Sequence, residues 1–251
     1  MTTTRTRPAA PPRRSGLDRD TAMRLAATEY GRYLDQLRSL DEADWGRATD
    51  CPAWDVRAMA GHCLGMAEFG ASLPTMARQN VVATRRGGEF IDELTDLQVQ
   101  ERRDLTPAQL IARYADVAAP AVRGRRRRSV LMGRLPMPGV QTINGTPERW
   151  TFGYLFDTIL TRDTWMHRVD TARATGRDLV LTPEHDGALV ADVVAEWAGR
   201  HGQPHTLTLT GPAGGRWGTG GQELELDAVE FCRLLSGRGH GDGLLAVEVP
   251  F

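Results

Sequence analysis

The stretch RDTWMHRVD, residues 162–170, places a carboxylate and an imidazole four positions apart, at Asp163 and His167. On a helix, side chains at this spacing share one face, so the two groups are placed to bind one metal ion together. A chain of 251 residues with six histidines and 32 acidic residues produces such a pair about once by chance. A metal site therefore needs a third ligand and a suitable fold.

Apolar residues at helical spacing predict four long helices, of which residues 162–170 belong to the last. These helices are expected over residues 18–37, from a cap at Asp55 to residue 67, from a cap at Thr106 to residue 123, and over residues 146–174. A shorter helix is expected near residues 88–102, and Gly176 ends the last helix. Four long helices with long crossovers form a bundle.

The connection between the third and fourth long helices begins with an arginine run at residues 123–128 and reaches Asn144-Gly145, which predicts a turn. An arginine run without interleaved aromatic residues, in a chain of balanced charge, is typical of a solvent-exposed loop. We therefore expect Arg125 and Arg128 to lie in solvent.

Beyond residue 178 the elements become shorter and mixed. A helix from residue 182, strands over 205–210 and 222–226, a helix over 227–235 and a strand over 244–249 are expected, with hairpin turns in the glycine-rich residues 211–221. The predicted fold is therefore mainly α with an α+β tail: a four-helix bundle at residues 16–177 and a small α+β domain at residues 178–251. Residues 1–15 are expected to form a disordered leader.

Composition excludes several classes of function. All 31 basic residues are arginine, so there is no lysine for a Schiff base or for a Walker-type phosphate loop. A net charge of −1 disfavours a dedicated nucleic-acid binder. Three cysteines without a disulfide framework, and no membrane span or signal peptide, favour the cytoplasm. The arginine bias is typical of a GC-rich, actinobacterium-like genome.

The third candidate ligand is His62, inside the second long helix. A bundle of this kind builds sites from side chains on facing helices, and two histidines with one carboxylate leave an open position on a zinc ion. The alternative is that His62 is a packed core histidine and that Asp163 and His167 form a surface pair.

Two stretches resemble one known family. The residues TDCPAWDVR (49–57), followed by His62, resemble the "CPGW-x-VR" pattern and helix-borne histidine of the mycothiol-dependent maleylpyruvate isomerases. Residues 163–170 with the ATGR at 174–177 resemble that family's "E-x-W-x-H-R-x-D … ATGR" pattern. The resemblance covers nearly the whole chain.

This resemblance implies a DinB-like four-helix bundle that binds a divalent metal, usually zinc, followed by a smaller domain similar to sterol carrier proteins. The implied ligands are His62, Asp163 and His167. The family has Glu where this chain has Asp163, which is one methylene shorter and requires a closer approach or a different coordination mode. The implied cofactor is the thiol mycothiol, activated by the metal for isomerisation of, or transfer to, an electrophilic small molecule.

Four further residues have candidate roles with alternatives. Asp170 lies two turns after Asp163, so it is expected either to orient a ligand histidine or to pair with Arg173 or Arg177. Trp54 and Trp165 either line the pocket for the cofactor or pack in the core. By the resemblance, Arg238 holds an anionic substrate or the thiol cofactor over the site; otherwise it is a solvated loop arginine.

The sequence thus predicts a metal-dependent thiol enzyme, an isomerase or S-transferase acting on an electrophilic small molecule. Two alternatives remain: a non-catalytic binding or regulatory module on the same fold, and a metal-dependent hydrolase with water in the open position.

Overall fold

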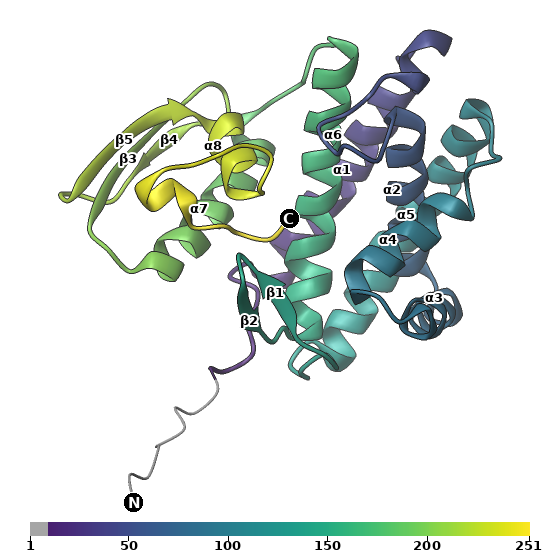
Figure 1. Cartoon of the computed structure of the whole chain (residues 1–251), viewed down its shortest axis with the longest axis horizontal. Coiled ribbons are helices and arrows are strands. Elements are labelled where there is room, and N and C mark those ends of the chain that lie inside the picture. Colours follow the sequence, from purple (N-terminus) through teal and green to yellow (C-terminus); the bar gives the residue numbers. More distant parts are fainter. Residues whose placement is uncertain (1–9) are drawn as a thin grey trace, which may run out of the picture.

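The computed structural model describes residues 10–251. Its N-terminal part is an assembly of helices, and its C-terminal part is a small sheet flanked by helices (Figure 1). The helices of the first part are α1 (Arg19–Arg38), α2 (Val56–Ala71), α3 (Leu73–Arg86), α4 (Phe90–Gln100), α5 (Pro107–Met132) and α6 (Leu160–Thr175). The mainly helical architecture with an α+β tail is the predicted one. None of the helices within residues 10–251 combines the length and apolarity needed to cross a membrane.

The helix starts follow their capping residues. Asp55 accepts a hydrogen bond from the backbone N–H of Ala58 at the start of α2, and Thr106 accepts one from Gln109 at the start of α5. Such caps satisfy backbone donors that have no partner inside the helix. Helix α3 was not predicted, although Ser72 caps it through the N–H of Thr75.

The predicted end of the third long helix at residue 123 is wrong, because α5 continues through the arginine run to Met132. Gly124 allows the close packing of α5 on α2, since a Cβ there would clash with the carbonyl oxygen of Gly70. Arg125 is fully buried and Arg128 nearly so, against the expectation that both lie in solvent. Their guanidinium groups bind carbonyl and hydroxyl oxygens of the core, which replace the water they give up.

The predicted helix start at residue 146 is also wrong. Residues Gln141–Ile143 (β1) and Thr146–Glu148 (β2) form an antiparallel hairpin. Its turn, Asn144–Gly145, has positive φ angles of 46° and 70° at both residues, as a two-residue hairpin turn requires. The helix begins only after Thr151, whose hydroxyl caps the N–H of Tyr154, and it opens with a π-helical segment, Tyr154–Ile159.

The tail contains α7 (Ala188–His201), preceded by a π-helical turn Pro183–Gly187, and the strands β3 (His205–Thr210), β4 (Gly215–Trp217) and β5 (Gln222–Asp227). Strand β3 lies in the middle, antiparallel to β4 and parallel to β5. Helix α8 (Ala228–Leu235) follows directly, capped by Asp227. The strand expected at residues 244–249 is wrong: residues Gly243–Ala246 form a 3-10 turn, and β4 arises inside the stretch expected to form only turns.

Helix α6 belongs to two cores at once. Its Trp165, Met166 and Val169 pack with apolar residues of α7, β3 and α8, while its other faces contact the bundle helices. Because both faces are covered, 13 of its 16 residues are buried. The division of the chain at residue 177 stays a prediction, since the core of the tail includes side chains of α6.

The predicted leader lies partly outside the described residues, which begin at residue 10. Within them, Arg13 exchanges backbone hydrogen bonds with Arg149 and Thr151 and pairs with Glu148. The expected disorder therefore does not extend to Arg13, because this residue is paired to the segment after β2.

Candidate metal centre

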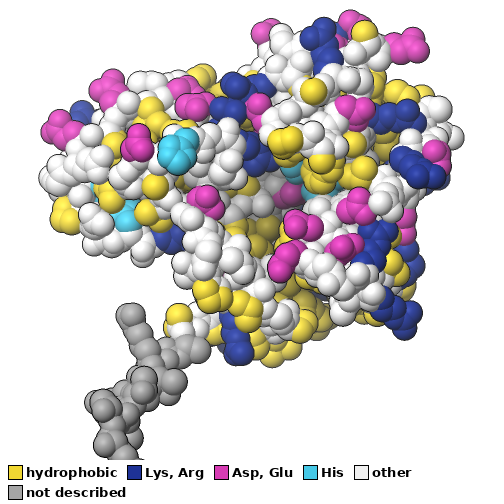
Figure 2. Space-filling model, viewed as in Figure 1, with side chains coloured by type: hydrophobic (Ala, Val, Ile, Leu, Met, Phe, Trp, Pro, Cys, Tyr) yellow, Lys and Arg dark blue, Asp and Glu magenta, His cyan; other side chains and the backbone are white. Residues whose placement is uncertain are grey.

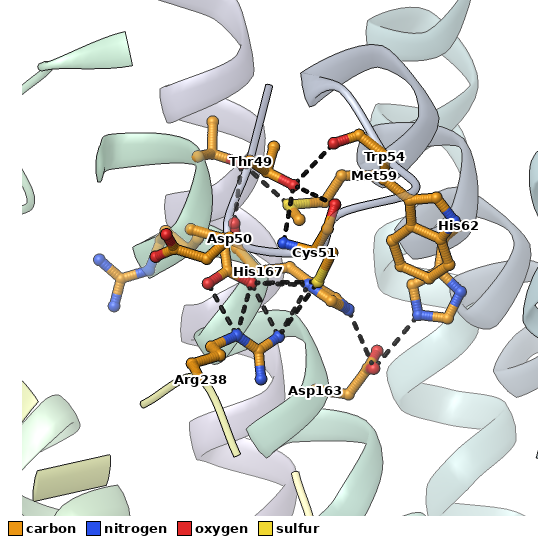
Figure 3. A network of polar contacts seen from close by, with 12 residues as sticks. Thr49, Asp50, Cys51, Trp54, Met59, His62, Asp163, His167 and Arg238 are labelled. Carbon is orange, nitrogen blue, oxygen red and sulfur yellow. Dashed lines mark hydrogen bonds and ion pairs between the residues drawn. The ribbon is translucent and has the colours of Figure 1, made fainter. Parts of the chain in front are cut away.

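Helix α2 brings His62 against α6. The side chain of His62 is 2% exposed, and its Nε2 lies 3.2 Å from Oδ1 of Asp163. The Nε2 of His167 lies 3.4 Å from the same carboxylate oxygen. The sequence-predicted trio His62, Asp163 and His167 therefore converges, with one ligand atom of each within 4.8 Å of the others (Figure 3).

The shorter side chain of Asp163 reaches both imidazoles, because α2 and α6 are packed against each other at this level. Burial raises the pKa of the Asp163 carboxyl, but the adjacent His62 and His167 outweigh it and hold this pKa far below its ordinary value. Asp163 is thus an anion, the form that binds metal.

The second nitrogen of His167, Nδ1, lies 3.1 Å from Oδ2 of Asp170. Burial lowers the pKa of His167, but the carboxylates of Asp163 and Asp170 hold it well above its ordinary value. A carboxylate on the far nitrogen of a histidine fixes the tautomer and the ring orientation. The alternative predicted for Asp170 is wrong, since Arg173 pairs with Asp50 and Arg177 with Asp41 and Asp44.

Arg238 lies just beyond α8, and its side chain extends from the tail to Asp170 on α6. Its Nε and Nη2 each lie 2.8 Å from the Asp170 carboxylate, and only 13% of its side chain is exposed. It is therefore not a solvated loop arginine. The bonds to Asp170 use Nε and Nη2, and in Figure 3 the remaining guanidinium nitrogen of Arg238 points away from the dashed contacts.

Cys51 lies beside Arg238 and Asp170, although it has no predicted role in the site. Its Sγ lies 3.7 Å from Nη2 of Arg238 and 4.0 Å from Oδ2 of Asp170. Its place beside Pro52, within residues 49–57, is the signal in the sequence, but spacing along the chain does not bring residues 51 and 170 together.

The two tryptophans have different outcomes. Trp54 is half-buried, and its ring centroid lies 4.9 Å from that of His62 and 5.7 Å from that of His167, so it forms a wall of the site. Trp165 is 1% exposed, packs in the tail core and donates Nε1–H to Asp186. Of the two roles expected for Trp165, its environment fits core packing, because its position on α6 directs it away from His167 into the other core.

A π-helical segment leads into the part of α6 that carries Asp163. Such segments leave backbone groups without the usual i→i+4 partner and occur often at functional sites. Here Nε of Arg125 donates to the carbonyl of Phe156 at 2.8 Å, and its Nη2 donates to Thr161 at 2.6 Å. Arg125 therefore stabilises the helix just before the candidate ligands.

The family model described as the mycothiol maleylpyruvate isomerase N-terminal domain matches residues 26–172. The chain belongs to this family. The match includes the three candidate ligands and Asp170, whereas Arg238 lies beyond it.

Two solved structures resemble about nine tenths of this chain. One, described as the mycothiol-dependent maleylpyruvate isomerase, has 18% identity and a TM-score of 0.57, and covers 90% of this chain and 92% of its own. The other, a histidine-to-alanine mutant described by the same name, has 16% identity and a TM-score of 0.53, and covers 89% and 90%. At these identities the likeness establishes the fold. No curated protein sequence gives a significant match.

The residues of this family member fit a divalent cation. Within the described residues, Oδ2 of Asp163 is buried and has no hydrogen-bond partner, although it belongs to an ionised carboxylate. A buried anionic oxygen without a donor is costly unless a cation satisfies it. Two neutral imidazoles and one carboxylate around a divalent ion leave a net charge of about +1 and an open coordination position.

A second acid and histidine cluster, formed by Glu29, His185 and Asp186, has a different character. The Arg168 guanidinium already lies between its acids, donating to Glu29 and to Asp186 at 2.6 Å each. Arg32 binds Asp186 as well. The cationic position is occupied by arginine, so this cluster holds α1, α6 and the start of the tail together.

Proposed function

We propose that this chain is an enzyme that uses a bound divalent metal, zinc, and the thiol mycothiol to isomerise, or to transfer the thiol to, an electrophilic small molecule. The observation that carries the proposal is the convergence of His62, Asp163 and His167 in a member of the mycothiol maleylpyruvate isomerase family. The mycothiol dependence is that named for the two similar structures.

Zinc bound to these ligands would supply a thiolate at neutral pH, because a coordinated thiol loses its proton. The protein's own groups prepare the site for this. Asp170 holds His167 as the tautomer with a proton on Nδ1, which leaves Nε2 free to bind the ion. The carboxylate of Asp163 neutralises part of the ion's charge.

Arg238 has a positioning role and a binding role in this proposal. Its Nε and Nη2 hold Asp170, and its Nη1, which takes no part in that ion pair, is available for an anionic group of the substrate or thiol. The half-buried Trp54 covers the two imidazoles and limits the access of water to them.

The chemistry begins when the thiolate attacks an electrophilic carbon, forming a C–S bond as the electrons of an adjacent double bond move onto the activating group. Rotation about the resulting single bond, followed by loss of the thiolate, gives the isomer. Release of the conjugate after protonation gives transfer. The two outcomes share one site.

The test is metal analysis of the purified chain together with consumption of activated alkenes in the presence and absence of mycothiol. We expect about one zinc per chain and thiol-dependent turnover, both lost in His167→Ala. The exposed His240 gives a matched control, and His240→Ala should retain both.

Three results would count against the proposal. Folded, metal-free protein without turnover would favour a binding or regulatory module. Turnover that needs metal but no thiol would favour a hydrolase. Equal zinc content in His167→Ala and the unaltered chain would remove His167 from the ligand set.

A further inference from the structure

The face of α6 that carries the candidate ligands changes its chemistry along the helix. Ile159, the last residue of the π-helical segment before α6, comes first, followed on α6 by Asp163 and His167 and then by Asp170 bound to Arg238. At about 1.5 Å per residue these positions extend over roughly 16 Å. The candidate ligands therefore lie between an apolar end and a cationic end.

Helix α2 also carries an apolar side chain next to its candidate metal ligand. Met66 lies four residues after His62, so the two share a face of the helix. Met66 is half-buried and packs against the same apolar cluster as Ile159, and Nε2 of Gln98 contacts its sulfur at 2.9 Å. One turn from the candidate metal ligands, both helices thus present apolar side chains.

This apolar cluster continues away from the ligands and is only partly covered. Its buried members include Phe69, Leu155 and Ile159, and the half-buried residues packed against it are Met66, Phe90, Met132, Met137, Ile143 and Phe152. Figure 2 shows a hollow between the tail and the bundle with apolar side chains on its floor. Methionines are flexible and polarisable, so such a surface adapts to apolar ligands of varied shape.

The β1–β2 hairpin bridges to the tail at the apolar end. Nδ2 of Asn144 donates to the carbonyl of Ala246 at 3.0 Å, so the hairpin turn touches the tail. Ile143, next in the chain, packs on the apolar cluster. At the opposite end, Asp170 binds Nε and Nη2 of Arg238, so Nη1 is the guanidinium nitrogen outside this ion pair.

From this gradient we propose that the electrophile is an amphipathic monoanion. Its carboxylate or equivalent anion lies toward Arg238, its reactive carbon at the metal ligands, and its alkyl or aryl arm along Met66 and Ile159 toward the hairpin. The inference rests on the proposed function for the location of the reaction. A second carboxylate at the distal end would lose water against apolar side chains, which is costly.

The test measures binding of unreactive saturated acids to the zinc-loaded full chain by calorimetry. The probes are butanoate, hexanoate and octanoate, with hexanedioate and octanedioate as matched dicarboxylates. We expect the affinity of the monocarboxylates to rise about fourfold per methylene, and each dicarboxylate to bind at least tenfold more weakly than the monocarboxylate of equal length.

Two variants locate the effect. Met66→Gln keeps the length of the side chain but makes it polar, and should flatten the increase with chain length while leaving butanoate unchanged. Ile143→Thr keeps a β-branched residue in the hairpin and should flatten the increase at octanoate. Leu131→Gln, at a residue that is 79% exposed on α5, is the control and should change nothing.

Equal binding of mono- and dicarboxylates, or no dependence on chain length, would overturn the inference. Zinc content and thiol-dependent turnover measured on the same preparation report on the proposed function separately. If affinity rises with chain length but no thiol-dependent turnover is found, the apolar arm of the ligand is supported and the thiol chemistry is rejected. If turnover is found only with short dianions, the thiol chemistry is supported and the apolar arm is rejected.

Discussion

The Asp170 carboxylate binds Arg238 through Nε and Nη2 at 2.8 Å each and at the same time lies 3.1 Å from Nδ1 of His167. A residue of the tail thereby acts on a candidate metal ligand of the bundle through one shared carboxylate. Burial raises the pKa of Asp170, but hydrogen bonds from His167 and Arg238 hold it below its ordinary value, so it is an anion at neutral pH.

Replacing Asp170 by Asn should weaken metal binding without removing a ligand. The amide cannot orient His167 or support its basicity as a carboxylate does, and loss of such a partner typically lowers metal affinity 10- to 100-fold. Competition with a zinc chelator measures the change, and Asp178→Asn, a substitution outside the site, is the control. Unchanged zinc affinity in a folded Asp170→Asn protein would contradict this role.

Zinc affinity should fall as the pH is lowered. The imidazole of His167 must be neutral to bind the ion, and its raised pKa in the metal-free protein means that protons compete at higher pH than for an ordinary histidine. We expect a loss of up to about tenfold per pH unit from this one proton. Zinc titrations between pH 8 and pH 6 measure it, and proton release on binding should accompany it. A flat profile would exclude His167 as a ligand.

Replacing Arg125 by Met should destabilise the fold by about 2–4 kcal/mol, because buried acceptors including the carbonyl of Phe156 lose their donors. Urea denaturation of the zinc-free protein measures this directly. The neighbouring Arg126 is exposed and pairs with an exposed Asp20, so Arg126→Met should stay within about 0.5 kcal/mol. Equal effects at the two positions would refute the assignment of a buried role to Arg125.

Replacing Gly124 by Ala should destabilise the bundle by about 1–3 kcal/mol, because the added Cβ meets the carbonyl oxygen of Gly70 and the helices must separate. Gly31, inside α1, provides a matched control with open space around its Cβ position. Gly31→Ala should stabilise the protein by about 0.5–1 kcal/mol, the helix propensity of alanine over glycine. Thermal denaturation of both variants distinguishes them by sign.

Two predicted elements differ from the structure because the conformation of their residues depends on contacts with other parts of the chain. The arginine run was expected to form an exposed loop, and it lies in α5 because Phe156, Thr161 and Tyr30 offer acceptors for Arg125. The sequence predicts the start of the last helix at Thr146, but the helix starts later because residues 141–148 pair with each other as a hairpin. Helical caps and two-residue turns have similar compositions, so local sequence did not separate them.

By itself the sequence determined what lies on one element: the helix starts at Asp55 and Thr106, the shared face of Asp163 and His167, and the family through its two matching stretches. The helix starts and the shared face follow from backbone geometry within a few residues, which the side chains set locally, and the family follows from the order of residues in the two stretches. Only the tertiary structure decided that Asp163 reaches His62, 101 positions away, that Asp170 binds Arg238, 68 positions away, and that Trp165 faces the tail core. Those contacts depend on how the helices pack, and packing is set by the burial of apolar surface over the whole chain rather than by spacing within any one segment.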